Sequence, residues 1–229
     1  MTINLSEHAL KLLDAQNKAR ELFQEIERRT LIQAGRTELE ISQLIFKLAE
    51  ELFQVQKYWH KRIVRAGKNT LHPYKENPPD RMIQNNDIVF IDLGPIFENW
   101  EADFGRTYVM GQDPRKIKLK QDVESAFHVA KEYYQSNSDI KASEFYHWIC
   151  ELANKYGWEY GGPYAGHLVG QFPHERILDD EIKLYIHPDN ELKLSEQDAQ
   201  GNHRYWILEI HFVDKALKIG GFYEELLNL

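Results

Sequence analysis

The segment IDLGPIFENWEADFGRT, residues 91–107, places two aspartates among apolar residues. Asp92 lies inside the otherwise apolar run Asp87–Leu93, which is rich in β-branched residues and is expected to be a strand. Alternation along that strand puts the Asp92 side chain on the same face as Phe90. A buried ionised carboxylate is costly unless it is paired, hydrogen-bonded or bound to a metal. Asp92 taken alone also fits a turn residue, because Gly94-Pro95 follows.

Asp103 lies in a second expected strand, Glu101–Met110. A hairpin that turns between Phe97 and Glu98 would place Asp103 directly opposite Asp92, with β-carbons about 4.5–5.5 Å apart. Two bare carboxylates at that separation repel, and one would keep a proton. Bridging of a pair of divalent metal ions is the other solution.

Two further carboxylates lie in apolar strands near the C-terminus. Glu209 is in the middle of WILEIHF, within the expected strand Tyr205–Val213, and Glu224 lies in the expected strand Gly221–Leu227. A solvated position explains either glutamate alone. Four acidic groups on apolar strands together indicate a common site.

Histidines are grouped in GPYAGHLVGQFPHERI, residues 162–177, which carries His167 and His174. Glycine and proline allow the sharp turns that bring loop side chains into a cleft. His72 opens a Pro-rich loop, and His60, next to Trp59, is interpreted as a surface residue. A hydrogen-bonded structural role is the alternative for each of these histidines.

The flanking sequence predicts helices and strands in one α+β domain spanning residues 1–229. Thr37 and Glu40 form a capping-box pattern, Asp113-Pro114 is typical of a helix start, and Gly157 is typical of a helix end. The expected helices cover residues 6–29, 37–55, 114–135 and 143–156, and a further short strand covers residues 62–66.

Composition excludes several classes of protein. Of 229 residues, 42% are hydrophobic and 28% charged, which is typical of a globular protein. Lys plus Arg number 28 against 36 Asp plus Glu, a net charge of −8, so no nucleic-acid partner is expected. Without a signal sequence or a long apolar run, we expect a cytoplasmic protein with no membrane segment. A single cysteine, Cys150, excludes an internal disulfide and a thiolate metal cage.

Five of these residues together resemble the metal-ligand set of the pita-bread metallopeptidases, which include methionine aminopeptidase, aminopeptidase P, prolidase and creatinase. The set is Asp92, Asp103, His167, Glu209 and Glu224. The matching segments are IDLGPIFENWEADFGRT, GHLVGQFPHE, ILEIHF and FYEELLNL, and the resemblance covers nearly the whole chain. The first segment is the most specific, because Arg106-Thr107 follows its second aspartate.

The resemblance implies an α+β pita-bread fold, with a curved antiparallel sheet flanked by helices. It also implies two divalent ions per chain. Asp92 would chelate one ion, Asp103 and Glu224 would bridge both, and His167 and Glu209 would complete the second. Oxygen-rich ligation with one imidazole suits Mn²⁺, Co²⁺, Fe²⁺ or Zn²⁺, and we favour Mn²⁺.

The activity that the resemblance implies is removal of an N-terminal residue from peptides, including the Xaa-Pro type. His174 would stabilise the developing negative charge, Glu209 would carry the proton to the leaving nitrogen, and His72 would contact the substrate. Arg106 and Thr107 would support the ligands, although a plain ion pair explains Arg106 equally well. We expect a peptide or small-molecule substrate and a homodimer.

The chain also departs from its relatives. Ile210 follows Glu209 where relatives have proline, while Phe222 and Pro163 replace an arginine and a histidine of the aminopeptidase P branch. A non-peptidase hydrolase of the creatinase type, acting on a small amidino or guanidino compound, is the alternative. A non-catalytic binding protein is the third class, and such a protein would be expected to lose ligands.

Overall fold

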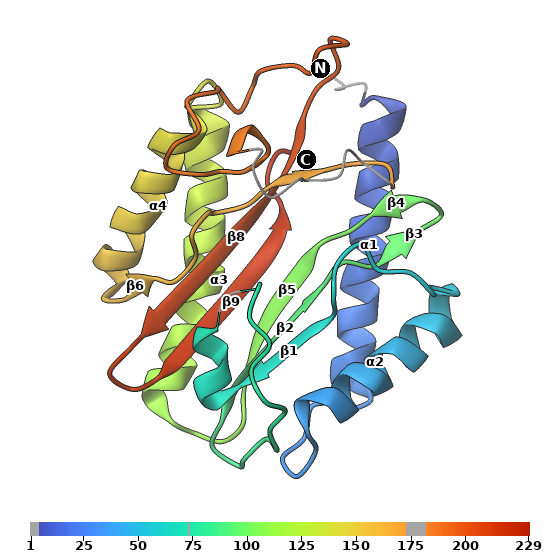
Figure 1. Ribbon diagram of the computed structural model, residues 1–229, viewed down its shortest axis with the longest axis vertical. Coiled ribbons are helices and arrows are strands. Elements are labelled where there is room, and N and C mark those ends of the chain that lie inside the picture. The colour runs from blue at the N-terminus through green and yellow to red at the C-terminus, as the bar shows by residue number, and fades with distance from the viewer. Residues whose placement is uncertain (1–4, 73, 173–181) are drawn as a thin grey trace.

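An antiparallel sheet forms the centre of the molecule (Figure 1). The computed structural model describes residues 5–72, 74–172 and 182–229. Across the sheet the order is β1 (Ile63–Ala66), β2 (Ile88–Leu93), β5 (Phe104–Val109), β9 (Ile219–Leu226), β8 (Tyr205–Asp214) and β6 (Glu159–Tyr160), with β7 (Leu168–Val169) paired to β8. A separate hairpin joins β3 (Ile96–Phe97) to β4 (Trp100–Glu101).

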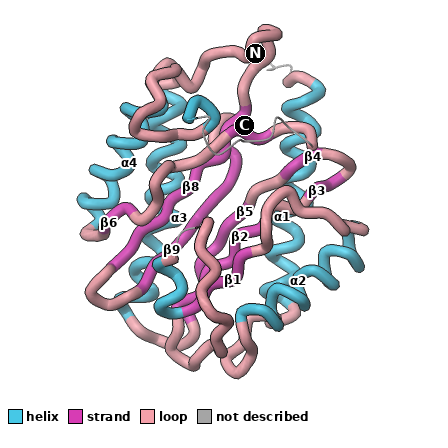
Figure 2. The backbone as a smooth tube through the Cα atoms, in the orientation of Figure 1, coloured by secondary structure: helices cyan, strands magenta, loops and turns pink. Residues whose placement is uncertain are grey.

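Within the described residues four α-helices flank the sheet, as predicted (Figure 2). They are α1 (Glu7–Arg28), α2 (Glu38–Phe53), α3 (Pro114–Ser136) and α4 (Ala142–Tyr156), and two short 3₁₀ helices cover Gly67–Leu71 and Ile182–Leu184. The predicted caps are confirmed. Thr37 and Glu40 form a reciprocal capping box, Asp113 accepts hydrogen bonds at the start of α3, and Gly157 ends α4 at φ 81°. None of the described helices contains a stretch long and apolar enough to cross a bilayer.

The helices pack on one face of the sheet in two groups. On the α1–α2 side the buried cluster includes Leu22, Ile45 and Ile91, and on the α3–α4 side it includes Phe127 and Leu208. Side chains alternate between the two faces along a strand. The residues next to these core residues in each strand therefore lie on the opposite face of the sheet. That opposite face carries the acidic residues.

The strand register aligns three of the predicted carboxylates across the sheet. Asp92 on β2 pairs with Gly105 on β5, Gly105 pairs with Glu224 on β9, and Glu224 pairs with Glu209 on β8. Residues paired in this way share a face, so Asp92, Glu224 and Glu209 form one row across four strands.

The predicted hairpin turn was wrong by one residue, and the predicted register by two. The turn is at Glu98-Asn99, with φ of 51° and 71°, and Asp92 therefore pairs with Gly105 rather than with Asp103. Two successive left-handed residues make the type I′ turn that matches the twist of a hairpin, and Asn tolerates that conformation well. Because the offset is two residues, Asp103 stays on the same face as Asp92.

Candidate metal centre

Gly105 shapes the centre of the carboxylate row. A β-carbon at Gly105 would lie 2.5 Å from the Phe222 ring and 3.1 Å from the β-carbon of Glu224. The missing side chain therefore lets the Phe222 ring lie over β5 and keeps Glu224 close to the neighbouring strand. Three of the four positions in the row carry carboxylates, and the fourth, Gly105, has no side chain.

Asp103 reaches this row from just before β5, and each of its oxygens faces a different imidazole. Its Oδ1 is 3.1 Å from Nε2 of His60, and its Oδ2 is 2.9 Å from Nε2 of His167. His167 Nε2 also lies 3.7 Å from Oε1 of Glu209. With only 3% of Asp103 exposed, this carboxylate is buried between the two rings.

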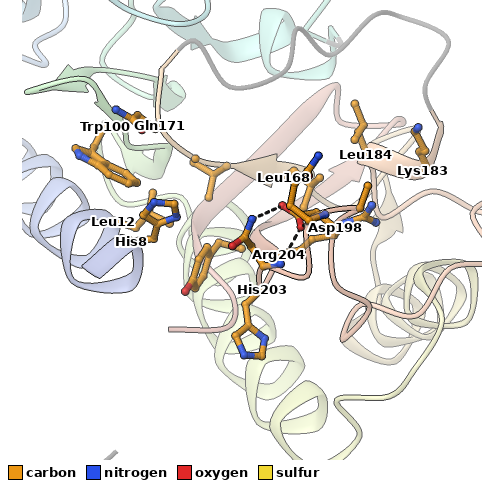
Figure 3. A pocket seen from close by; sticks show the side chains of 16 residues that line it. His8, Leu12, Trp100, Leu168, Gln171, Lys183, Leu184, Asp198, His203 and Arg204 are labelled. Carbon is orange, nitrogen blue, oxygen red and sulfur yellow. Dashed lines mark hydrogen bonds between the residues drawn. The ribbon is translucent and has the colours of Figure 1, made fainter. Parts of the chain in front are cut away.

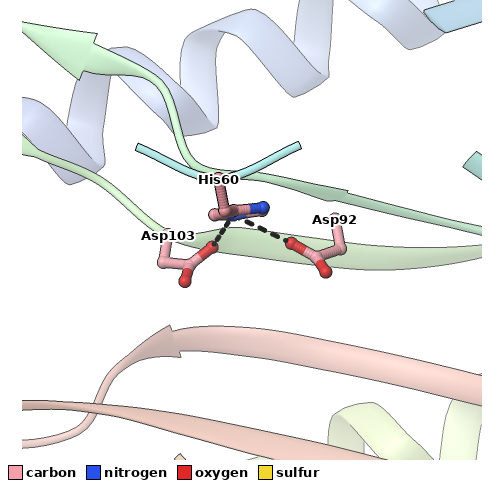
Figure 4. A group of neighbouring side chains, drawn as sticks. All are labelled: His60, Asp92 and Asp103. Carbon is pink, nitrogen blue, oxygen red and sulfur yellow. Dashed lines mark hydrogen bonds and ion pairs between the residues drawn. The ribbon is translucent and has the colours of Figure 1, made fainter. Parts of the chain in front are cut away.

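His60 belongs to this centre, so the interpretation of it as a surface residue was wrong. It is 9% exposed, and its Nε2 lies 3.4 Å from Oδ1 of Asp92 as well as close to Asp103 (Figure 4). The pairing of β1 with β2 puts Ile63 opposite Asp92, so the residues just before Ile63 run past the end of β2. Placing His60 would have required knowledge of that pairing, because His60 itself lies outside any regular strand.

Burial and mutual contact determine the pKa values of these carboxylates and histidines. Burial raises the pKa of Asp92 and of Glu224, and it raises the pKa of Glu209 to about 8. Burial alone would lower the pKa of both histidines, but the adjacent carboxylates raise the pKa of His60 and of His167 to about 9.

Asp103 has the opposite shift from the other carboxylates. Burial alone would raise its pKa, but the neighbouring His60 and His167 hold it below its usual range. In the absence of a cation, protons on the surrounding groups therefore compensate the buried negative charge.

The residues present fit a pair of divalent cations. Asp92 Oδ1 and Glu224 Oε2 are buried and have no hydrogen-bond partner among the described residues. Two groups of three residues each bring their ligand atoms within 4.8 Å of one another, and both groups include Asp103. One consists of His60, Asp92 and Asp103, and the other of Asp103, His167 and Glu224. Carboxylate oxygen and imidazole nitrogen are common ligands of divalent first-row metals.

The predicted substrate-contacting residue His72 borders a cleft that reaches the carboxylates. The cleft has a volume of about 230 Å³, and its lining includes His72, Phe90, Asp92, Glu209 and Phe222. His72 pairs through Nδ1 with Glu76 at 2.5 Å. The predicted catalytic residue His174 lies outside the described residues.

Arg106 and Thr107 support β9, the strand that carries Glu224. The Arg106 guanidinium lies 3.8 Å from the rings of both Phe104 and Tyr223, pairs with Glu225, and donates to the backbone oxygen of Glu224 at 3.2 Å. The Thr107 hydroxyl bridges both backbone groups of Phe222. Arg106 is therefore both an ion-pair partner and a support for the backbone of Glu224.

A second cavity, of about 310 Å³, is lined in part by Leu168 of β7 (Figure 3). Its lining includes His8, Trp100, Leu168 and His203, and it contains none of the clustered carboxylates. Asp198 on its rim hydrogen-bonds to Asn202. This cavity is therefore separate from the metal centre.

Comparison with known proteins identifies the family. Residues 11–199 match the model of metallopeptidase family M24. The chain belongs to this family. The matched region includes Asp92, Asp103 and His167, while Glu209 and Glu224 lie beyond it and join the centre through the register of β8 and β9. M24 proteins depend on divalent metal ions, in agreement with the candidate ligand groups.

Solved structures confirm the predicted fold. A dipeptidase from Pyrococcus horikoshii OT3 matches with a TM-score of 0.73 and 27% identity, over 94% of this chain and 55% of that chain. A methionine aminopeptidase from Thermotoga maritima matches with a TM-score of 0.70 over 99% of this chain and 94% of that one. At 17% identity, this second match shows the fold alone.

Among curated proteins, an Xaa-Pro dipeptidase from Lactobacillus delbrueckii subsp. lactis is similar over a short region. It is 36% identical over 56 residues, which is 24% of this chain and 15% of the dipeptidase. The chain thus spans about half the length of the Pyrococcus dipeptidase and aligns with a much smaller part of this relative.

Proposed function

We propose that the chain is a metal-dependent exopeptidase that removes the N-terminal residue from short peptides. The observation that carries the proposal is the row of Asp92, Glu224 and Glu209, with Asp103 and His167 beside it, at a cleft in a protein of family M24. Names of similar proteins, a dipeptidase and an Xaa-Pro dipeptidase, support this class of reaction.

Five residues would hold two ions in this proposal. Asp92 would hold one ion, His167 and Glu209 would hold the other, and Asp103 and Glu224 would contribute ligands to both. The excess of carboxylate ligands favours Mn²⁺. When bound, such ions lower the pKa of water and polarise a carbonyl oxygen.

The chain's own residues supply the remaining steps. Glu209 borders the cleft, and its carboxyl group is assigned the transfer of a proton to the leaving nitrogen. His72, on the rim of the same cleft, contacts the substrate. His174 is assigned the stabilisation of the developing negative charge, on the basis of its spacing from His167.

The cleft favours a small apolar side chain next to the scissile bond. Ile63, Phe90 and Phe222 form one apolar cluster, and all three line the cleft together with Pro163. A proline ring or a small aliphatic side chain would make apolar contacts with these lining residues. The preferred substrates are therefore short peptides with proline or a small apolar residue in second position.

Peptide hydrolysis after removal and return of metal tests the proposal. Chelator-treated protein is supplied separately with Mn²⁺, Co²⁺ or Zn²⁺ and given di- and tripeptides with proline, alanine or lysine in second position. We expect metal-restored release of the first residue, fastest with an apolar second residue, and no cleavage of N-acetylated controls. Two bound ions without cleavage of any peptide would contradict the proposal and favour the small-substrate hydrolase.

A further inference from the structure

We propose that His60 is a sixth ligand of the metal centre, so that each of the two ions has one imidazole. The inference rests on the two-ion centre of the proposed function and adds a ligand to it. The surroundings of His60 repeat those of His167. In each histidine Nδ1 hydrogen-bonds the carbonyl oxygen of the next residue, at 2.7 Å in His60 and 2.8 Å in His167. Each then directs Nε2 to a different oxygen of Asp103.

The hydrogen bond at Nδ1 determines which nitrogen is available. A ring that donates its Nδ1 proton to a carbonyl oxygen presents the lone pair of Nε2 once the second proton has left. Metal-binding histidines are commonly oriented by a hydrogen bond of this kind at the other ring nitrogen. His60 therefore has the tautomer that ligation through Nε2 requires.

The separations around His60 match ligands of one ion. Its Nε2 is 3.1 Å from Oδ1 of Asp103 and 3.4 Å from Oδ1 of Asp92. Ligand atoms about 2.1 Å from a common ion, at angles of about 90–110°, lie about 3.0–3.4 Å apart. Both distances from His60 Nε2 are therefore those expected between two ligands of one ion.

The position of His60 is fixed by the surrounding backbone. The segment before it pairs with the end of β2, through the bond from Trp59 N to Gly94 O at 3.0 Å and from Ile96 N to Lys57 O at 3.1 Å. A β-carbon at Gly94 would collide with the His60 ring. The missing side chain of Gly94 thus makes room for the imidazole beside Asp92.

One indole lies against both imidazoles. The Trp59 ring centroid is 4.4 Å from that of His60 and 5.0 Å from that of His167, and Trp59 Nε1 donates to Ala102 O at 3.2 Å. A shared neighbour limits the movement of both rings. The two histidines are therefore held as a pair on either side of Asp103.

His211 provides a matched control. It is also buried, but its Nε2 bonds to the Thr70 backbone oxygen at 3.0 Å, and it belongs to neither group of candidate ligands. A glutamine at position 60 or 211 keeps a polar side chain of similar length. Loss of metal binding specific to position 60 would separate ligation from a general need for a buried histidine.

The test is X-ray absorption on the Co²⁺-loaded full chain, combined with Co²⁺ binding by calorimetry. We expect one imidazole per ion in the unmodified protein and in His211→Gln, and one imidazole for every two ions in His60→Gln. We also expect His60→Gln to weaken the affinity for one of the two ions by about tenfold or more, as judged from losses of ligand support.

Other results would overturn the inference. Two ions with a single imidazole between them in the unmodified protein would show that His60 is not a ligand. Binding of both ions by His60→Gln with unchanged affinity would also show that His60 is not a ligand. A chain that binds no ion would instead contradict the metal centre of the proposed function, and the two failures are therefore distinguishable.

Discussion

In the candidate metal centre, Asp103 lies between the two histidines, because each of its oxygens faces a different imidazole. The carboxylates beside it have raised pKa values, whereas its own is lowered by those two rings. Cations that enter the centre replace protons on its ligands, so metal binding is expected to release protons and to weaken as the pH falls.

His211 is predicted to make stability depend on pH outside the metal centre. Burial lowers its pKa to about 4, so between pH 6.5 and 4 the unfolded chain binds a proton that the folded chain does not. The stability contribution is therefore complete above pH 6.5 and is lost as the pH falls. For this residue we expect the free energy of unfolding to be about 2 kcal/mol lower at pH 5 than at pH 7.

Urea unfolding of metal-free protein and of His211→Gln measures this effect as a difference between the two proteins. The pH dependence that arises from other titratable groups is the same in both proteins and cancels in the difference. An equal pH dependence in the two proteins would show that His211 does not titrate as its burial requires.

The carboxylates could be predicted from the sequence because burial of an ionised carboxylate is energetically costly. Asp92 and Glu209 lie among residues that are otherwise apolar. The register of the strands then places both in one row with Glu224. His60 was missed because nothing local distinguishes it. Its place depends on the backbone pairing of its segment with the end of β2 and on the space left by Gly94.

Among the elements, β5 and β9 bring the two sides of the sheet together at Gly105 and Glu224. Thr107 reinforces the junction by bonding both backbone groups of Phe222, two residues before Glu224. The position of Glu224 therefore depends on how closely these two strands approach.

Gly105→Ala is expected to disturb this junction. The added β-carbon would overlap the Phe222 ring, and overpacking of this kind costs about 1–3 kcal/mol. We expect lower stability in thermal unfolding and weaker metal binding. In Gly105→Ala combined with Phe222→Ala, the loss of stability should be smaller than the sum of the single losses, because the clash has been removed. Additive losses would contradict this explanation.

Thr37→Ala tests an element far from the metal centre. The Thr37 hydroxyl accepts a bond from Glu40 N at 3.2 Å in the capping box of α2. Its loss should lower the free energy of unfolding by about 1 kcal/mol in urea. Thr37→Ser should keep most of the stability. Both variants should bind metal normally, and a loss of metal binding in either would show that α2 affects the centre.

Helix positions could be predicted because caps are local signals, as Asp113 and Gly157 show. The hairpin register could not, because it depends on which two residues adopt left-handed conformations. Glu98 and Asn99 do so, one position beyond the turn expected from the sequence. The expected strand from Glu101 to Met110 is divided into β4 and β5, with a break at Ala102 and Asp103.

At the scale of the whole molecule, the metal centre lies where the two helix-backed groups of strands meet. Asp92 and Asp103 come from the α1–α2 side, and His167, Glu209 and Glu224 come from the α3–α4 side. Ions bound between the two sides would link them. Any ligand that binds only the folded state raises its stability.

Metal-free protein is expected to become less stable as the pH rises from 6.5 to 9. Burial raises the pKa of Glu209 to about 8, so the folded chain keeps a proton that the unfolded chain has released. His60 and His167 have pKa values of about 9 in the folded chain. As the pH rises towards 9 they lose their protons, and the stabilising attraction between the charged rings and the carboxylates is lost as well. The melting temperature of chelated protein should fall over this range and that of metal-loaded protein should change less. A chelated protein whose melting temperature rises with pH would contradict the prediction.

The most direct test of the central claim is a count of ions bound per chain, made together with an assay of peptide cleavage. The unmodified protein and Asp103→Asn are stripped with chelator, reloaded with Mn²⁺, and analysed for bound metal and for release of an N-terminal residue. We expect two ions and cleavage in the unmodified protein, with loss of both ions and of activity in Asp103→Asn. Full cleavage by the chelated protein, or by Asp103→Asn, would contradict the central claim.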